Sequence, residues 1–172
     1  AASELSAAGI IKQADLWQRA RIGAHHNRPA VVRSAILLAA PDSLPFVNDA
    51  IGNPAAFLAH RDTATNPARR ALVPLALTRL ASSDFGQAAQ QLRGQWAGQM
   101  DRADQDWVWG SIGRWAAIRR SDDAISHFRQ VRDERNLHGE HLEWKVRTAL
   151  RHGDWVQVGR SIQAMPPAMQ QN

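Results

Sequence analysis

The residues best suited to hold a metal ion form the run His138-Gly139-Glu140-His141, with Glu143 close behind. A helix that binds zinc through a His-Glu-x-x-His motif needs its two histidines four residues apart, so that both point to one face. Here the spacing is three residues, and Gly139 favours a loop. The sequence therefore predicts no metal site, and we interpret Glu140 and Glu143 as carboxylates that complement a helix dipole.

Carboxylate pairs, which glycoside hydrolases use as acid and base, can be sought in two clusters. Asp101, Asp104 and Asp106 form one cluster, and Asp122 and Asp123 form the other. Both precede apolar helical runs, where aspartate commonly caps a helix N-terminus. The chain contains no phosphate loop, dinucleotide fingerprint or nucleophile elbow. We therefore predict no catalytic residue and no cofactor.

Tryptophan is the third residue type that could make a site, because aromatic faces stack on sugars and bases. Trp107, Trp109 and Trp115 lie close together in the sequence. Trp115 continues a helical stripe with Ile112, which predicts packing between helices. Trp107 and Trp109 cannot both face the same side of a helix, so one of them is predicted to be a surface aromatic. Core packing is the main interpretation of this group, and ligand stacking is the alternative.

The charge balance allows an anionic partner without identifying one. Formal net charge is +5, from 21 Lys and Arg against 16 Asp and Glu, and nearly all of the cations are arginine. Basic and acidic residues alternate, and no basic run exceeds two residues, so we predict no nucleic-acid partner. No apolar run approaches the length of a membrane span. The absence of cysteine excludes disulfides and is compatible with an oxidising compartment.

Length and pattern predict an all-α fold. The 172 residues, 44% of them hydrophobic, suit one globular domain with a real core. Apolar residues recur at helical spacing nearly everywhere, and no segment alternates as a strand does. The helices are expected at about 11–24, 29–39, 43–51, 54–60, 67–82, 85–96, 104–120, 123–136, 142–150 and 155–165.

Residues typical of helix starts and helix ends support these predicted helix ranges. Asn53-Pro54 and Asn66-Pro67 each offer a capping side chain before a proline at the first helical position. Gly153 suits a left-handed cap at a helix C-terminus. Pro74, inside an apolar run, predicts a kink or a late helix start. Three aspartates are predicted to cap the helices after them: Asp84, Asp122 and Asp154.

An internal repeat appears when residues 16–36 are laid on residues 142–162. Repeated units of paired helices are typical of an α-solenoid, in which each pair buries its apolar face against its neighbours. We therefore predict a superhelix of antiparallel helical hairpins over residues 1–172 as a single domain, with a compact helical bundle as the alternative. The matches include Leu16 on Leu142, Arg21 on Arg147, His26 on His152 and Ile36 on Ile162.

The segment at residues 142–166, LEWKVRTALRHGDWVQVGRSIQAMP, resembles the part of soluble lytic murein transglycosylases that precedes their linker and catalytic domains. Three other segments resemble earlier parts of that family. They read LWQRARIGAHHNRPAVVRSAILLA, NPAAFLAHRDTATNPARRALVPLALTRLASSDFGQAA and WVWGSIGRWAAIRRSDDAISHF. Together the resemblance covers nearly all of the chain from about residue 11 onward.

The resemblance implies a U-shaped superhelical domain of a periplasmic enzyme of cell-wall turnover. Such enzymes cleave the MurNAc–GlcNAc bond of peptidoglycan without water and leave 1,6-anhydro-muramoyl ends. Their catalytic domain carries a Glu-Ser pair, a Gly-Leu-Met-Gln run and an Ala-Tyr-Asn-Ala-Gly run, none of which occurs here. The N-terminal residues also lack the pattern of a signal peptide. The chain is therefore expected to be a fragment, namely the helical scaffold and not the catalyst.

The implied partners are peptidoglycan glycan strands and the parent protein's own linker and catalytic domains. Two rival functions remain: a tetratricopeptide-like adaptor, supported by the repeat-helix pattern of RRSDDAISHFRQV, and a free-standing enzyme. The residues predicted to contact glycan on exposed helix faces are Arg114, Arg119, Arg147, Arg151 and Trp109.

Overall fold

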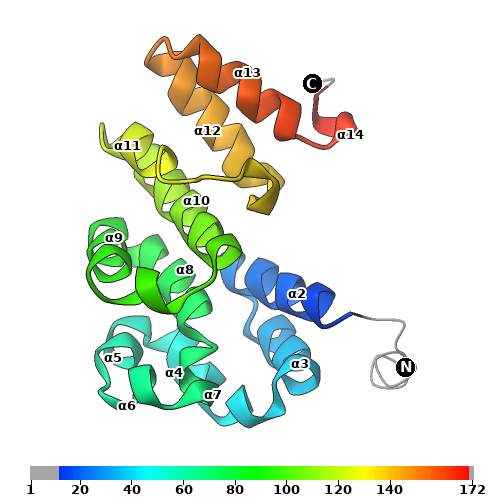
Figure 1. Cartoon of the computed structure of the whole chain (residues 1–172), viewed down its shortest axis with the longest axis vertical. Helices are drawn as coiled ribbons and strands as arrows, with labels where there is room; N and C mark the ends of the chain where they lie inside the picture. The colour runs from blue at the N-terminus through cyan, green and yellow to red at the C-terminus, as the bar shows by residue number, and fades with distance from the viewer. Residues whose placement is uncertain (1–11, 171–172) are drawn as a thin grey trace. The chain divides into compact units, whose positions relative to one another are not determined.

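The computed structural model describes residues 12–170, and all of its regular structure in that range is helical (Figure 1). No strand occurs in residues 12–170, which confirms the all-α prediction. Within the same range, no helix has the length and apolar character that crossing a membrane requires. The first predicted helix begins at residue 11, which lies outside the described residues.

Contacts between residues group the chain into two compact units, one up to Leu80 and the other from Ala81. The boundary falls inside α8 (Val73–Ser83). Each unit is described separately below. The prediction of one superhelical domain over residues 1–172 stays a prediction.

In the first unit, α2 (Gln13–His25) packs against α3 (Pro29–Ala39) (Figure 1). The two helices come close at Gly23, because a Cβ there would lie 3.0 Å from a methyl group of Val32. Their buried faces carry small and branched apolar residues at helical spacing, which accounts for the pairing. These residues are Leu16, Ala20, Ala24, Val32, Ala35 and Ile36.

The rest of the first unit consists of short helical segments around a buried arginine. The guanidinium of Arg69 lies 5.0 Å from the ring centre of Phe46 and 4.7 Å from that of Phe57. Its Nε donates to Thr63 Oγ1 at 3.2 Å, so this buried cation is both stacked and hydrogen-bonded. The segments are η1 (Pro41–Phe46), α4 (Val47–Gly52), α5 (Pro54–Ala59), α6 (Asp62–Thr65) and α7 (Pro67–Arg70).

The second unit is arranged around α10 (Arg102–Ile118). This helix contacts α9 (Phe85–Gln91), α11 (Ala124–Phe128) and α12 (Gly139–Arg151), and α12 in turn contacts α13 (Trp155–Ala164) (Figure 1). Short segments complete the unit: η2 (Leu92–Trp96), η3 (Ala97–Gln99), η4 (Glu134–Asn136) and α14 (Pro167–Gln170).

Most of the predicted caps are confirmed. The side chain of Asn66 accepts the backbone N–H groups of Ala68 and Arg69, and Asp84 and Asp154 each accept the N–H group three residues ahead. Pro74 is the second residue of α8, which confirms the late helix start.

Two predicted caps are wrong. Asn53 precedes α5 and Pro54 is the first residue of that helix, as predicted, but the Asn53 side chain accepts no capping hydrogen bond. Asp122 is not the residue before α11. That position belongs to Asp123, and the preceding turn is closed instead by Ser121, whose hydroxyl accepts the N–H of Asp123 at 3.2 Å.

Several predicted helices differ from the structure, and the ranges 43–51 and 67–82 are each divided, into η1 and α4 and into α7 and α8. The helix expected over 123–136 ends at Phe128, and residues 85–96 divide into α9 and a π-helix, η2. Gly139 is the first residue of α12 and not part of a loop, because His138 caps that helix by accepting the N–H of Glu140.

Three helix pairs turn through a residue with positive φ. Asn27 (φ 53°) follows α2, Arg120 (φ 57°) follows α10 and Gly153 (φ 67°) follows α12. Asn27 and Gly153 occupy equivalent positions of the sequence repeat, so the aligned segments share this local turn geometry as well as their helices.

Candidate functional site

Arg114, one of the predicted glycan contacts, is largely buried. Its side chain is 15% exposed, and its Nη2 donates to Glu140 Oε2 at 2.8 Å. The guanidinium also lies 5.0 Å from the ring centre of Trp115. The expectation that Arg114 lies on an exposed helix face is therefore wrong, because its charge is used to join α10 to α12.

The other three predicted arginines are exposed but do not share a cavity. Arg119 donates to the backbone oxygens of Ser82 and Ser83 at 2.7 and 2.9 Å, which caps the end of α8. Arg147 pairs with Glu143 at 3.6 Å and borders a cavity of about 340 Å³. Arg151 is exposed in the last turn of α12. Arg147 and Arg151 lie one turn apart on α12, whereas Arg119 follows the end of α10.

Trp109 is 5% exposed and Trp107 is fully buried, so the prediction that one of them faces solvent is wrong. Trp109 stacks on His127, with ring centres 6.0 Å apart, and has no free face to offer a sugar. The exposed aromatic is Trp155, at 71%, which sequence reasoning missed. Trp155 is the first residue of α13, directly after the cap Asp154. A residue at this position has few neighbours on its own helix, and this position was the sequence feature that could have predicted its exposure.

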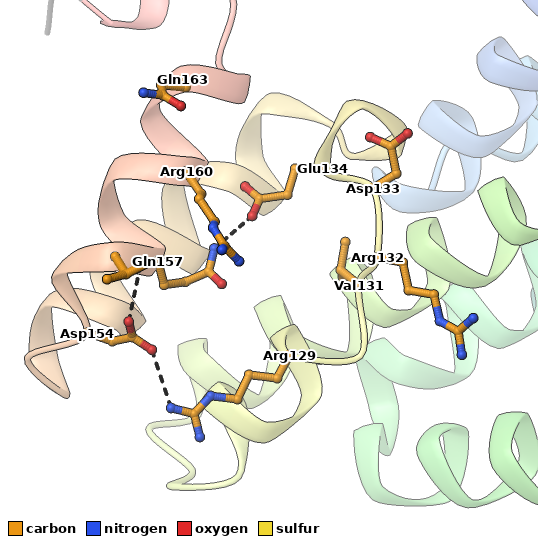
Figure 2. A pocket seen from close by; sticks show the side chains of 10 residues that line it. Arg129, Val131, Arg132, Asp133, Glu134, Asp154, Gln157, Arg160 and Gln163 are labelled. Atoms are coloured by element: carbon orange, nitrogen blue, oxygen red, sulfur yellow. Dashed lines mark hydrogen bonds and ion pairs between the residues drawn. The ribbon is translucent and has the colours of Figure 1, made fainter.

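Another cavity of the second unit lies between α13 and the chain that follows α11, and its volume is about 570 Å³ (Figure 2). Arginine, carboxylate and glutamine side chains line most of it, with Val131 and Val156 as the apolar residues. Its charged residues are Arg129, Arg132, Arg160, Asp133, Glu134 and Asp154.

A buried ion pair forms one wall of this cavity. Glu134 Oε1 accepts hydrogen bonds from Lys145 Nζ at 3.0 Å and from Gln157 Nε2 at 2.7 Å. The Lys145 side chain is 2% exposed, so its charge needs this partner. Gln157 also donates to Ser161 Oγ at 3.0 Å, which fixes the amide between η4 and α13.

Asp154 anchors the other wall. Its carboxylate accepts the backbone N–H of Gln157 at 3.1 Å and pairs with Arg129 at 3.3 Å (Figure 2). The Gln157 hydrogen bond, and after it the charges of Arg129 and Arg160, hold the pKa of Asp154 below its ordinary value. Asp154 therefore stays ionised and keeps Arg129 at the cavity.

Three arginines and three carboxylates line the cavity, but cations outside the lining partner two of the carboxylates. Each of its three carboxylates has a cationic partner: Asp133 pairs with Arg135, Glu134 with Lys145 and Asp154 with Arg129. Arg160 and Arg132 form no ion pair with the described residues. Figure 2 shows Arg160 beside the cavity, whereas Arg132 points away from α13. Arg160, with the exposed amide of Gln163, is suited to bind an anionic or polyhydroxylated ligand.

The remaining predicted candidates serve the fold. Asp101 caps α10 by accepting the N–H of Asp104 at 2.7 Å, as its place before an apolar run predicted. His141 is buried, with its ring centre 4.9 Å from that of Trp107 and its Nε2 3.2 Å from Ser111 Oγ. Asp106 is also buried and accepts three hydrogen bonds, a role that no local pattern indicated.

A comparison with models of known protein families finds no match, and a comparison with curated proteins finds none either.

Proposed function

We propose that this chain is a helical scaffold segment of a periplasmic soluble lytic murein transglycosylase, whose full-length form cleaves the MurNAc–GlcNAc bond of peptidoglycan. One structural observation carries the proposal together with the sequence resemblance. The two aligned segments, 16–36 and 142–162, each fold as a helix pair with a positive-φ residue at the same position. A repeated helix pair is the building block that such a scaffold requires.

The proposed superhelix forms by side-by-side stacking of these pairs. Contacts within the second unit support this arrangement, because α12 packs against both α10 and α11 as well as against its own partner α13. A stacked array of pairs gives an extended wall that can position a separate catalytic domain rigidly. In this proposal the segment holds the substrate and the parent enzyme's other domains perform the cleavage.

We place the glycan contact at the 570 Å³ cavity beside α13 and at Trp155, an exposed residue of the same helix. The peptide stems of peptidoglycan carry carboxylates, which the guanidiniums of Arg129 and Arg160 can bind. An exposed indole offers a face for a sugar ring. Arg119, Arg147 and Arg151 stay as further surface cations, whereas Arg114 and Trp109 are excluded by their burial.

Sedimentation of the purified chain with isolated sacculi tests this contact. We expect pelleting at low salt that weakens as ionic strength rises, because exposed charge pairs are screened. Arg160→Gln should reduce the pelleted fraction several-fold, and Trp155→Ala should do the same. Arg61→Gln serves as the matched control, since the Arg61 side chain is 95% exposed and belongs to the first unit. Absence of pelleting at low salt would remove the direct contact from the proposal.

A tetratricopeptide-like adaptor is the second candidate, and one packing feature favours it. Phe128 of α11 lies so close to Gly113 of α10 that a Cβ on Gly113 would be 2.7 Å from its ring. The spacing Trp109-x2-Ile112-Gly113, followed by Ala124-x3-Phe128, fits the tetratricopeptide pattern of a helix pair. An adaptor should retain one stoichiometric protein partner in a pull-down, whereas the proposed scaffold should retain sacculi.

A further inference from the structure

A third cavity of the second unit, with a volume of about 550 Å³, lies among α9, η2 and α11. This volume is within the range typical of small-molecule sites. Phe85 and Ala89 give the cavity an apolar side, and Gln90, Arg93 and His127 give it polar groups. None of its lining residues also lines the cavity beside α13, so the two sites are distinct.

His127 lines this cavity and carries a polar atom that has no partner in the structure. The residue is 6% exposed, and its buried Nδ1 has no hydrogen-bond partner. Its ring is held on two sides, stacked on Trp109 at 6.0 Å and edge-on to Phe85 at 6.2 Å. Protein atoms enclose Nδ1, whereas Nε2 is not among the buried atoms that lack a partner, so the ring can meet a ligand through Nε2.

Arg93 supplies an available positive charge at the same cavity. It is exposed, forms no ion pair with the described residues, and its guanidinium lies 4.9 Å from the ring centre of Trp109. Arg93 belongs to the π-helix Leu92–Trp96, a backbone form that occurs frequently at functional sites. The neighbouring Gly94 leaves open space, since a Cβ built there meets no atom within 4 Å.

The charges around His127 indicate the sign of the ligand. Burial, and after it the positive charge of Arg93, lower the pKa of His127, while Asp123 at the start of α11 raises it by less. The imidazole is therefore neutral at neutral pH and can present an N–H without adding charge. Arg93 is left as the group that selects an anion.

We propose that this cavity binds a small carboxylate-bearing ligand. The carboxylate pairs with Arg93 and accepts a hydrogen bond from His127 Nε2–H, while the apolar part of the ligand lies on Phe85 and Ala89. Asp123, with the opposite charge at the rim, disfavours a second carboxylate and tolerates an ammonium group. This inference does not depend on the proposed peptidoglycan function.

Isothermal titration with three probes tests the site: alanyl-alanine, alanyl-alaninamide and glucuronic acid. We expect alanyl-alanine or glucuronic acid to bind and the amide, which lacks a carboxylate, to fail. Binding of the dipeptide alone identifies a peptide C-terminus as the source, and binding of glucuronic acid alone identifies an acidic sugar. Binding of both supports a carboxylate site with little further selection.

Variants assign the binding to this cavity. Arg93→Gln and His127→Phe should each weaken the bound probe about tenfold or more, which corresponds to about 1.4 kcal/mol. The phenyl ring keeps the stacking on Trp109 but lacks a nitrogen. Gly94→Phe fills the open space and should abolish binding without disturbing the fold. Arg102→Gln, at an exposed arginine outside the cavity, is the control and should bind as the wild type does.

Two results overturn the proposal. One is failure of both carboxylate probes to bind at concentrations up to about 10 mM, where even a weak specific site should fill. The other is equal binding of alanyl-alanine and its amide. If His127→Phe does not fold, the binding measurements on Arg93→Gln and Gly94→Phe test the proposal without it. Both positions are exposed and lie outside the hydrophobic core.

Discussion

Asp106 organises the connection between α11 and α12. Its carboxylate accepts the backbone N–H groups of Arg132 at 2.9 Å and Asp133 at 3.2 Å, and the amide of Asn136 at 2.8 Å. In a continuous helix, the N–H groups of Arg132 and Asp133 would donate to backbone carbonyls four residues earlier. Here the Asp106 carboxylate accepts them instead. One buried side chain on α10 therefore determines where α11 ends and how η4 begins.

Replacing Asp106 with alanine should destabilise the second unit by about 3 kcal/mol, because two backbone donors and one amide lose their acceptor in a buried place. Urea unfolding monitored by circular dichroism measures the change. Asp122→Ala is the control, since Asp122 is exposed and caps no helix, and it should shift stability by less than about 0.5 kcal/mol. Equal stability of the two variants would contradict this role for Asp106.

His127 predicts a loss of stability in mild acid. Burial and Arg93 lower its pKa in the folded chain below the ordinary 6.5, so the unfolded chain binds a proton that the folded chain does not. The resulting penalty is absent at neutral pH and grows as pH falls through 6.5 toward the lowered pKa. Thermal unfolding between pH 7.5 and 5, values that bracket the unperturbed histidine pKa of about 6.5, should show a smaller decrease for His127→Phe than for the wild type.

The role of a residue could be predicted from the sequence where the residue interacts with its near neighbours in the chain. Asn66, Asp84 and Asp154 act as caps because the groups they bond lie two or three residues ahead in the sequence. The environments of Arg114 and Trp109 depend instead on partners brought in by other helices. No spacing rule within one helix could have indicated their burial.

At the scale of elements, α10 and α11 pack through a fit between an aromatic ring and small residues. Phe128 is fully buried, and Ala116, Ala117 and Ala124 surround it. Gly113 is required because the ring occupies the place of its missing Cβ. The close fit of the Phe128 ring against Gly113 therefore stabilises the helix pair in addition to the burial of apolar surface.

Gly113→Val should therefore destabilise the second unit by about 2 to 3 kcal/mol through overpacking. Phe128→Ala should cost about 3 to 5 kcal/mol through the cavity it leaves. Gly98→Ala is the control, because a Cβ at Gly98 meets nothing within 4 Å. Denaturant midpoints measure all three variants, and a neutral Gly113→Val would show that α10 and α11 pack differently.

Helix boundaries could be predicted where proline or a cap fixes them. The range 29–39 is found as α3, and Pro74 gives α8 its late start. The end of α11 could not be predicted, since its cause is Asp106 on another helix. Nor could the π-helix at Leu92–Trp96, because one wider turn hardly changes the spacing of apolar residues.

At the scale of the whole molecule, the proposed superhelix and the alternative compact bundle predict different dimensions. A compact domain of this length has a radius of gyration of about 16 Å. A side-by-side stack of helix pairs is more extended, and we expect a radius near 20 Å by small-angle X-ray scattering, with an asymmetric distance distribution. A symmetric distribution near 16 Å would favour the bundle.

The identity of the parent protein is the central proposal, and the coding sequence downstream of the codon for Asn172 tests it most directly. We predict that sequencing this region reveals a linker followed by a lysozyme-like segment with a Glu-Ser pair and the Gly-Leu-Met-Gln and Ala-Tyr-Asn-Ala-Gly runs. A stop codon directly after Asn172, or an unrelated domain in its place, would contradict the assignment to a lytic murein transglycosylase.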